Sequence, residues 1–254
     1  MPGINEINVN TVYQTVLSIL NKEQRGYLTP FEFNNIAQQV QLEIFESYFE
    51  NLTQQLRNPK NSSDYANRVK LLQEKISVFG EDVALTVTSV GNKGEATFPI
   101  NLHRLGTLEL NYGTRTPVQI QEVNRQEFNL SIRSNLTKPS VDWPIFFQQG
   151  NKVRILPDNP SAGALYSYKI QYIRKPLDPI WGFTIGGVGQ YVYDSTAYAA
   201  GPPATGSRNF EISDVDQTEL ILGILRYAGI IIKDTEMVQM ASGLANQQDQ
   251  LEQA

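Results

Sequence analysis

The first eighty residues carry apolar side chains at helical spacing. Between residues 9 and 20 they recur every three or four positions, which predicts an amphipathic helix with Asn8 as its N-cap. A narrower stripe between residues 65 and 76 predicts another helix, which Gly80 would close. Together with the helix between these two, residues 1–82 are expected to form an N-terminal helical segment of three helices.

The middle helix is predicted from Thr29 to about Leu52 and is apolar on more than one side. Its main stripe consists of Phe33, Ile36, Ala37, Val40, Ile44, Tyr48 and Leu52. A second stripe consists of Leu42, Phe45 and Phe49. A helix of this kind is either central in its own domain or shared with another subunit. These last three residues are therefore candidate subunit contacts.

The segment before this helix, residues 21–32, has the skeleton of an EF-hand calcium loop, with glycine sixth and glutamate twelfth. Ligand positions 1, 3, 5 and 12 would be taken by Asn21, Glu23, Arg25 and Glu32. Arginine at position 5 would place a cation beside the metal ion. The sequence Thr29-Pro30-x-Glu is instead a helix capping box with proline at the first helical position. We interpret the loop as a helix-turn-helix joint and predict no metal site.

From residue 83 the pattern changes to the alternation typical of strands. Residues 83–90 alternate with period two and lead into the turn Gly91-Asn92-Lys93-Gly94. Further along, the sequence predicts strands at 107–110 and 117–123, a short helix within 124–135, a hairpin around Gly150-Asn151, and a long strand that begins at Leu165 and ends at Pro176. Residues 83–176 are therefore expected to form a β-rich unit.

Residues 177–212 are rich in glycine, alanine, proline and tyrosine. A phosphate-binding loop would need its glycines to open a helix, but here they lead into a strand pattern at Tyr191. We interpret the segment as an extended loop or arm that becomes ordered on contact with a neighbour. Tyr191, Tyr193 and Tyr198 are its candidate subunit contacts.

Residues 213–254 are expected to be helical and to pack with the N-terminal helices. Ser213 followed by Asp216 resembles a capping box, and the apolar stripe after it would end at Gly229. Asp234 would cap a last helix whose stripe is Met237, Met240, Ala241, Leu244 and Leu251. The predicted fold class is α+β, a helical bundle of N- and C-terminal helices with a β-rich unit inserted between them.

Composition narrows the functional classes. The chain has 254 residues, a net charge of -5 and no cysteine, which excludes disulfides and thiol catalysis. Charged residues make up 19% of the chain, below the usual quarter, and such a surface is less costly to bury against partners. The longest apolar run, from Leu220, is too short for a bilayer and contains Arg226. Lys and Arg do not cluster as phosphate contacts require.

Catalytic motifs are absent from the sequence. The single histidine, His103, has no carboxylate or serine arranged around it, and neither a nucleophile elbow, a zinc pair nor a P-loop occurs. We therefore predict no enzyme activity, no catalytic residue and no cofactor.

Three stretches resemble structural proteins of tailed bacteriophages, above all the crAss-like phages. They are VYQTVLSILNKEQRGYLTPFEFNNIAQQVQLEIFESYFENL near the start, VRILP followed by YIRKP in the β-rich unit, and LILGILRYAGIIIKD before a glutamine-rich tail. The resemblance lies in their order along the chain. It implies a virion protein of the ring or adaptor class, the head-to-tail connectors of short-tailed phages, and a place in the virion neck or tail after synthesis in the bacterial cytoplasm.

The same resemblance implies partners and leaves alternatives. Implied partners are further copies in a closed ring, dodecameric by resemblance, the portal protein and other neck or tail ring proteins, with DNA only as passing cargo and no membrane. One alternative is another virion component, such as a tail-tube or baseplate subunit. The other is a β module that binds host glycan through Trp143, Trp181 and nearby tyrosines, which would require exposed rings.

Overall fold

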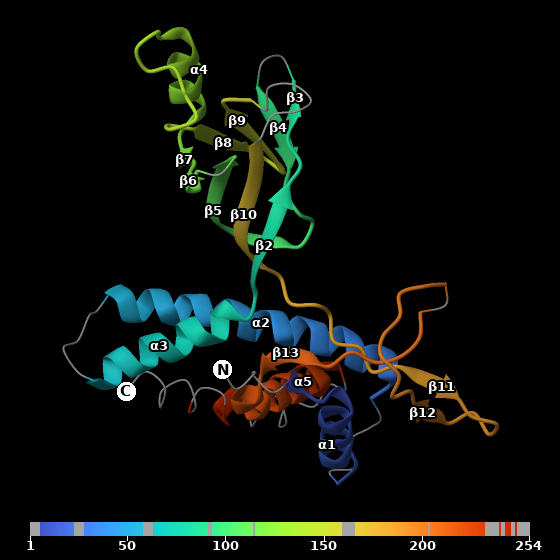
Figure 1. The fold of residues 1–254 in the computed structure, drawn as a ribbon. Helices are drawn as coiled ribbons and strands as arrows, with labels where there is room; N and C mark the ends of the chain where they lie inside the picture. Colours follow the sequence, from blue (N-terminus) through green and yellow to red (C-terminus); the bar gives the residue numbers. More distant parts are fainter. Residues whose placement is uncertain are drawn as a thin grey trace. The chain divides into compact units, whose positions relative to one another are not determined.

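The computed structural model describes residues 6–22, 28–57, 63–90, 93–113, 115–158, 166–202 and 204–231, with isolated positions at 239, 242–244 and 247 (Figure 1). The fold class is α+β, as predicted. The chain divides into unit 1, Met1–Val78 with Pro176–Ala254, and unit 2, Phe79–Lys175. Unit 2 is therefore an insertion in the sequence of unit 1, and the segment that follows Pro176 belongs to unit 1.

Unit 1 begins with three helices that the sequence predicted. They are α1 (Val9–Lys22), α2 (Pro30–Arg57) and α3 (Ser63–Ser77). Asn8 accepts hydrogen bonds from the amides of Asn10 and Thr11, so it caps α1. The helix α2 runs five residues beyond the predicted end at Leu52. Gly80 does not close α3, because it begins the first strand of unit 2.

The capping box at the start of α2 is confirmed. The Thr29 amide donates to the Glu32 carboxylate at 2.9 Å, and the Glu32 amide donates to the Thr29 hydroxyl at 3.3 Å. These hydrogen bonds hold the pKa of Glu32 below its usual value. In the EF-hand comparison, Asn21 lies in the last turn of α1, whereas Glu23 and Arg25 lie outside the described residues. Glu32 serves as a helix cap.

The C-terminal part of unit 1 returns to these helices. The strands β1 (Glu6–Ile7) and β13 (Phe210–Ser213) pair antiparallel, and the 3-10 turn η1 (Asp214–Asp216) leads into α5 (Gln217–Ile231). The helix α5 packs against α1 and α2, and Figure 1 shows it beside them. Gly229 does not end α5, which continues to Ile231. The predicted last helix, from Asp234, falls almost entirely outside the described residues.

Asp216 has a different role from the one predicted. Ser213 makes no side-chain cap, and Asp216 is buried. Its carboxylate accepts from Lys75 Nζ at 2.7 Å and from the Tyr48 hydroxyl at 2.5 Å. The side chains of Lys75 and Asp216 are only 13% and 7% exposed. This buried ion pair joins α2, α3 and η1 in one network.

Unit 2 contains two sheets that share one apolar core. The first sheet has the order β2-β10-β5-β6, and the second has the order β3-β4-β9-β8-β7. Their bounds are β2 (Gly80–Leu85), β3 (Thr88–Ser89), β4 (Gly94–Thr97), β5 (Leu102–Tyr112), β6 (Val118–Gln119), β7 (Gln121–Glu122), β8 (Ile145–Gln149), β9 (Lys152–Leu156) and β10 (Tyr166–Arg174). Both sheets contribute to one buried cluster, with Leu108 and Ile170 from the first and Val153 and Ile155 from the second.

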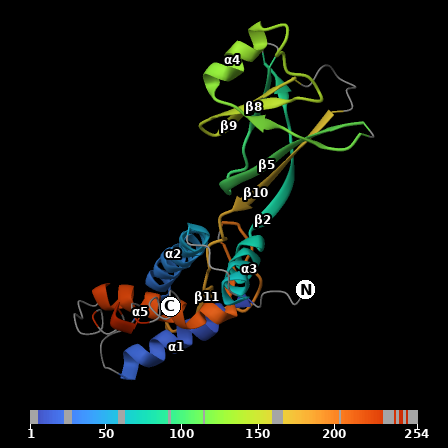
Figure 2. The same cartoon turned by 90° about the vertical axis from the view of Figure 1, so that its left-hand side faces the viewer.

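Two strands predicted as continuous are divided between these sheets. Residues 83–90 split into β2 and β3, which belong to different sheets. Residues 117–123 split around the buried Ile120 into β6 and β7, again in different sheets. The hairpin of β8 and β9 is confirmed, with Gly150 at φ 60° in its turn. The short helix is also confirmed as α4 (Arg125–Arg133), which packs Phe128 against Phe147 of β8 (Figure 2).

The chain enters and leaves unit 2 through neighbouring strands. β2 and β10 pair antiparallel from Gly80 opposite Ile173 to Leu85 opposite Tyr168. The Arg174 amide donates to the Phe79 carbonyl at 2.9 Å. Both ends of unit 2 are therefore closed by its own hydrogen bonds. None of the helices in the described residues is both long enough and apolar enough to span a membrane.

Candidate functional site

The surface most suited to binding a partner is a hairpin within the Gly/Ala/Pro/Tyr-rich segment. The strands β11 (Phe183–Ile185) and β12 (Tyr191–Tyr193) pair antiparallel. Their turn is closed by a hydrogen bond from the Gly186 amide to the Gln190 carbonyl at 2.8 Å. Between Phe183 and Tyr193 the sequence FTIGGVGQYVY carries no charge. Proteins usually protect exposed strand edges with charged residues or proline, and this hairpin has neither.

One face of the hairpin is an aromatic and aliphatic ladder. The register pairs Phe183 with Tyr193 and Ile185 with Tyr191, so these four side chains share a face. Phe183 and Tyr191 stand edge to face, with ring centroids 4.9 Å apart. Ile185 is 71% exposed and Val188 in the turn is 90% exposed. The ladder is pre-organised by its own ring contacts and remains accessible to a partner.

The hairpin is fixed to the helices at its base by Trp181, which is only 3% exposed. The indole Nε1 donates to Asn10 Oδ1 at 3.0 Å, and the Trp181 amide donates to Asn34 Oδ1 at 2.8 Å. The ring lies 4.5 Å from that of Tyr13 and 5.6 Å from that of Tyr193. One tryptophan therefore joins α1, α2 and the hairpin. The ring is not accessible for stacking on a sugar, as the glycan alternative required.

A second set of hydrogen bonds ties the residues after the hairpin to its base. Asp194 Oδ1 accepts from the hydroxyl and amide of Thr196, at 2.7 and 3.0 Å, and Oδ2 accepts from the Gly206 amide at 3.1 Å. These bonds, with the Thr196 hydroxyl foremost, hold the pKa of Asp194 below its usual value. The Ser207 hydroxyl donates to the Asp194 carbonyl and accepts from the Gly182 amide. The segment expected to be an extended arm is thus internally hydrogen-bonded over its described part.

Replacing Gly182 with alanine is expected to destabilise the hairpin base. A Cβ at Gly182 would lie 2.1 Å from the Gly206 carbonyl oxygen, so main chain would have to move. We expect a loss of about 1–3 kcal/mol in the free energy of unfolding, as for other overpacked sites. Gly187→Ala is the matched control, because its Cβ would meet no atom within 4 Å.

Urea unfolding and hydrogen exchange at the Ile180 and Arg208 amides, which pair with each other's carbonyls, would measure the effect. Equal stability of the two variants would contradict the tight contact. So would unchanged exchange at both amides in Gly182→Ala.

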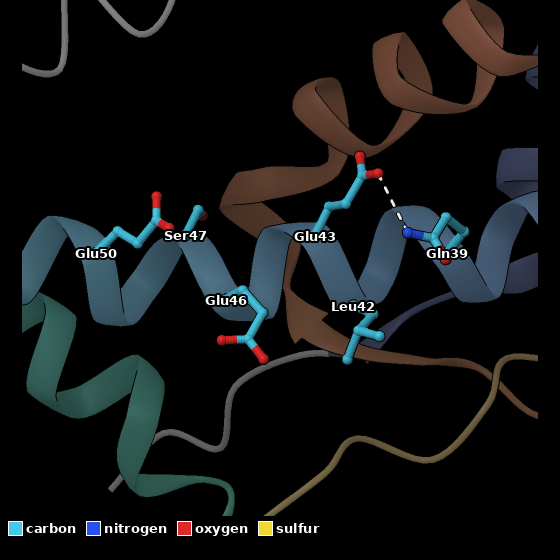
Figure 3. A pocket seen from close by; sticks show the side chains of 6 residues that line it. All are labelled: Gln39, Leu42, Glu43, Glu46, Ser47 and Glu50. Atoms are coloured by element: carbon cyan, nitrogen blue, oxygen red, sulfur yellow. Dashed lines mark hydrogen bonds between the residues drawn. The ribbon is translucent and has the colours of Figure 1, made fainter.

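A polar hollow of about 310 Å³ lies on α2 and is lined by Gln39, Leu42, Glu43, Glu46, Ser47 and Glu50 (Figure 3). Glu43 accepts from Gln39 Nε2 at 3.3 Å, from Arg226 at 2.9 Å and from the Tyr227 hydroxyl. Its hydrogen bond raises the pKa of Tyr227. The Ser47 hydroxyl donates to the Ile44 carbonyl at 2.7 Å. Glu43 and Ser47 are thus held by neighbours within the chain, and the six residues come from one helix. We assign this hollow no chemistry.

The remaining predicted contact residues fall into two groups. Phe45 and Phe49 are buried inside unit 1, so in this fold the second stripe of α2 is core, the first of the two alternatives its pattern allowed. Leu42 is half-buried beside the polar hollow, and Tyr191 is exposed on the hairpin. Tyr193 packs on Trp181, and Tyr198 lies under the Arg208 guanidinium at 4.3 Å.

Other residues considered for chemistry lie apart from the hairpin. Trp143 is 78% exposed in unit 2, and His103 lies half-buried on β5. Among the described residues, acidic, histidine and cysteine side chains form no group of three that could hold a metal ion. The role of Trp181 was not predicted, although its position between Pro179 and a Gly-rich turn marked an element boundary.

Comparison with known proteins leaves the functional assignment to this geometry and to the sequence pattern. No family model matches the chain, and a search of curated proteins finds no significant match.

Proposed function

We propose that this protein is a structural subunit of a phage virion, a ring protein of the neck that joins the portal to the tail and surrounds the DNA conduit. The observation that carries the proposal is the β11–β12 hairpin, an uncharged apolar element on a buried tryptophan anchor. An apolar surface held in place before binding is what an obligate assembly uses, because little ordering entropy is then lost on contact.

Two further observations support the assignment. The order of short motifs along the chain resembles ring and adaptor proteins of short-tailed phages, above all the crAss-like phages. A net charge of -5 suits a conduit for DNA, since like charge reduces adhesion of the passing duplex. The partners would be further copies of the chain, the portal and neighbouring ring proteins. The protein would act through shape and contact, without a cofactor.

Native mass spectrometry of the purified protein, alone and mixed with the portal protein of the same phage, tests the proposal. We expect a closed homo-oligomer, either by itself or only in the presence of the portal. A monomer in both samples would contradict a connector role. A homo-oligomer that ignores the portal would favour a tail-tube or baseplate subunit instead.

A further inference from the structure

Unit 1 places two different apolar surfaces at separate positions along α2. The base of the hairpin is held near the start of this helix, where Asn34 exchanges two hydrogen bonds with Trp181. The end of α3 is held further along, where Tyr48 and Lys75 both bind Asp216. The two anchor residues on α2 are fourteen positions apart, or about 21 Å along a helix. Figures 1 and 2 both show α3 away from β11 and β12.

The second surface lies around the ion pair of Lys75 and Asp216. Leu71 precedes Lys75 by one helical turn, Val78 follows it by three residues, and Val215 is next to Asp216. All three apolar side chains are exposed. We call Leu71, Val78 and Val215 the α3 patch. The two charges among them are paired and buried, and nearby Glu74 forms an ion pair with Lys70 at 3.9 Å. The patch therefore offers apolar contact around a neutralised centre.

A second copy of the chain is the occupant that these surfaces favour. The hairpin has no cation for a phosphate and no carboxylate for a basic partner, so it needs an uncharged apolar surface. The α3 patch is such a surface on the same chain, and the separation along α2 prevents the rigidly anchored hairpin from covering it within one copy. Because the two surfaces differ, a contact between them is heterologous and can repeat from subunit to subunit.

We propose that the β11–β12 hairpin of one copy docks on the α3 patch of the next copy, head to tail. This inference rests on the proposed role as an assembly subunit and names the surfaces through which copies meet. Ile185 and Val188 supply the apolar tip, and Leu71, Val78 and Val215 receive it.

The natural absence of cysteine makes a direct test possible. In the full-length double variant Val188→Cys with Leu71→Cys, a short bis-maleimide should give a ladder of covalent oligomers. A mixture of the two single variants should give dimers only, and each single variant alone should remain monomeric. The control is Val188→Cys with Ile100→Cys, because Ile100 in unit 2 is fully exposed but lies outside the proposed contact. We expect at least about tenfold less cross-linked product from it, equivalent to about 1.4 kcal/mol of preference.

A substitution without cross-linking provides a second measurement. Val188→Asp should weaken self-association at least about tenfold in sedimentation, whereas the matched control Val90→Asp, on an exposed residue of unit 2, should not. Dimers from Val188→Cys alone would show hairpin-to-hairpin pairing and overturn the inference. Equal products from both double variants, or no product, would also overturn it. If native mass spectrometry still shows a ring with the portal in that case, the proposed function survives and only these surfaces are wrong.

Discussion

Asp216→Ala is expected to destabilise unit 1 by about 3–5 kcal/mol, the usual cost of removing one partner from a buried ion pair. Lys75 Nζ lies 2.7 Å from Asp216 and its side chain is only 13% exposed. Without the carboxylate, a cation would remain buried beside the Tyr48 ring, 5.0 Å from its centroid. The Tyr48 hydroxyl would also lose its acceptor. Urea unfolding followed by circular dichroism would measure the loss.

The control is Asp214→Ala, two residues earlier in the same 3-10 turn, where the side chain is exposed. That change should alter stability by no more than about 0.5 kcal/mol. Adding Lys75→Met to Asp216→Ala should recover part of the loss, because the unpaired charge is then removed as well. If the two aspartate variants unfold at the same urea concentration, the ion pair does not hold α3 as described.

Trp181→Ala is the second large effect, with an expected loss of about 3–5 kcal/mol. The substitution empties a site where the indole contacts the Tyr13 and Tyr193 rings and donates to Asn10. It should also release the hairpin, so we expect faster hydrogen exchange at the Gly186 amide, whose hydrogen bond closes the turn. Self-association should weaken together with the loss of the anchor, because the apolar ladder would no longer be held in place.

Trp143→Ala provides the matched comparison, since it removes the same side chain from a position that is 78% exposed. The free energy of unfolding should change by no more than about 0.5 kcal/mol. Similar losses for both tryptophan variants would contradict the assignment of Trp181 as the anchor. A stability loss in Trp181→Ala with unchanged exchange at Gly186 would place the anchor's effect in the helices alone.

The sequence predicts the helices well because their signals are local. The capping box of Thr29 and Glu32 fixes the start of α2, and the glycine at position 150 marks the β8–β9 turn. Alternation shows which residues of 83–90 face a core, but it carries no information about which sheet they join. The change of sheet between β2 and β3 depends on pairing with β10 and β9 far along the chain, so the pattern alone could not predict it.

The candidate site is harder to predict for a related reason. Tyr191 and its neighbours could be identified as a strand with accessible tyrosines, but Trp181 could not be assigned to the core from its surroundings in the sequence. Its partners Asn10 and Asn34 lie 171 and 147 residues away. Asp216 was interpreted as a helix cap because local spacing suggests one, whereas its actual partner Lys75 is 141 residues away. Long-range polar partners leave no periodic signal.

The insertion of unit 2 has a consequence for the order of synthesis. Both ends of unit 2 are closed by pairing between β2 and β10, so all of its strands leave the ribosome before Pro176 does. The helices α1 to α3 are made earlier, but α5 and Asp216, which cover and hold them, are made last. Domains generally fold as units during translation. Unit 2 can therefore fold while the apolar surface of α2 is still uncovered, and the first part of the chain to be made is among the last to reach its final packing.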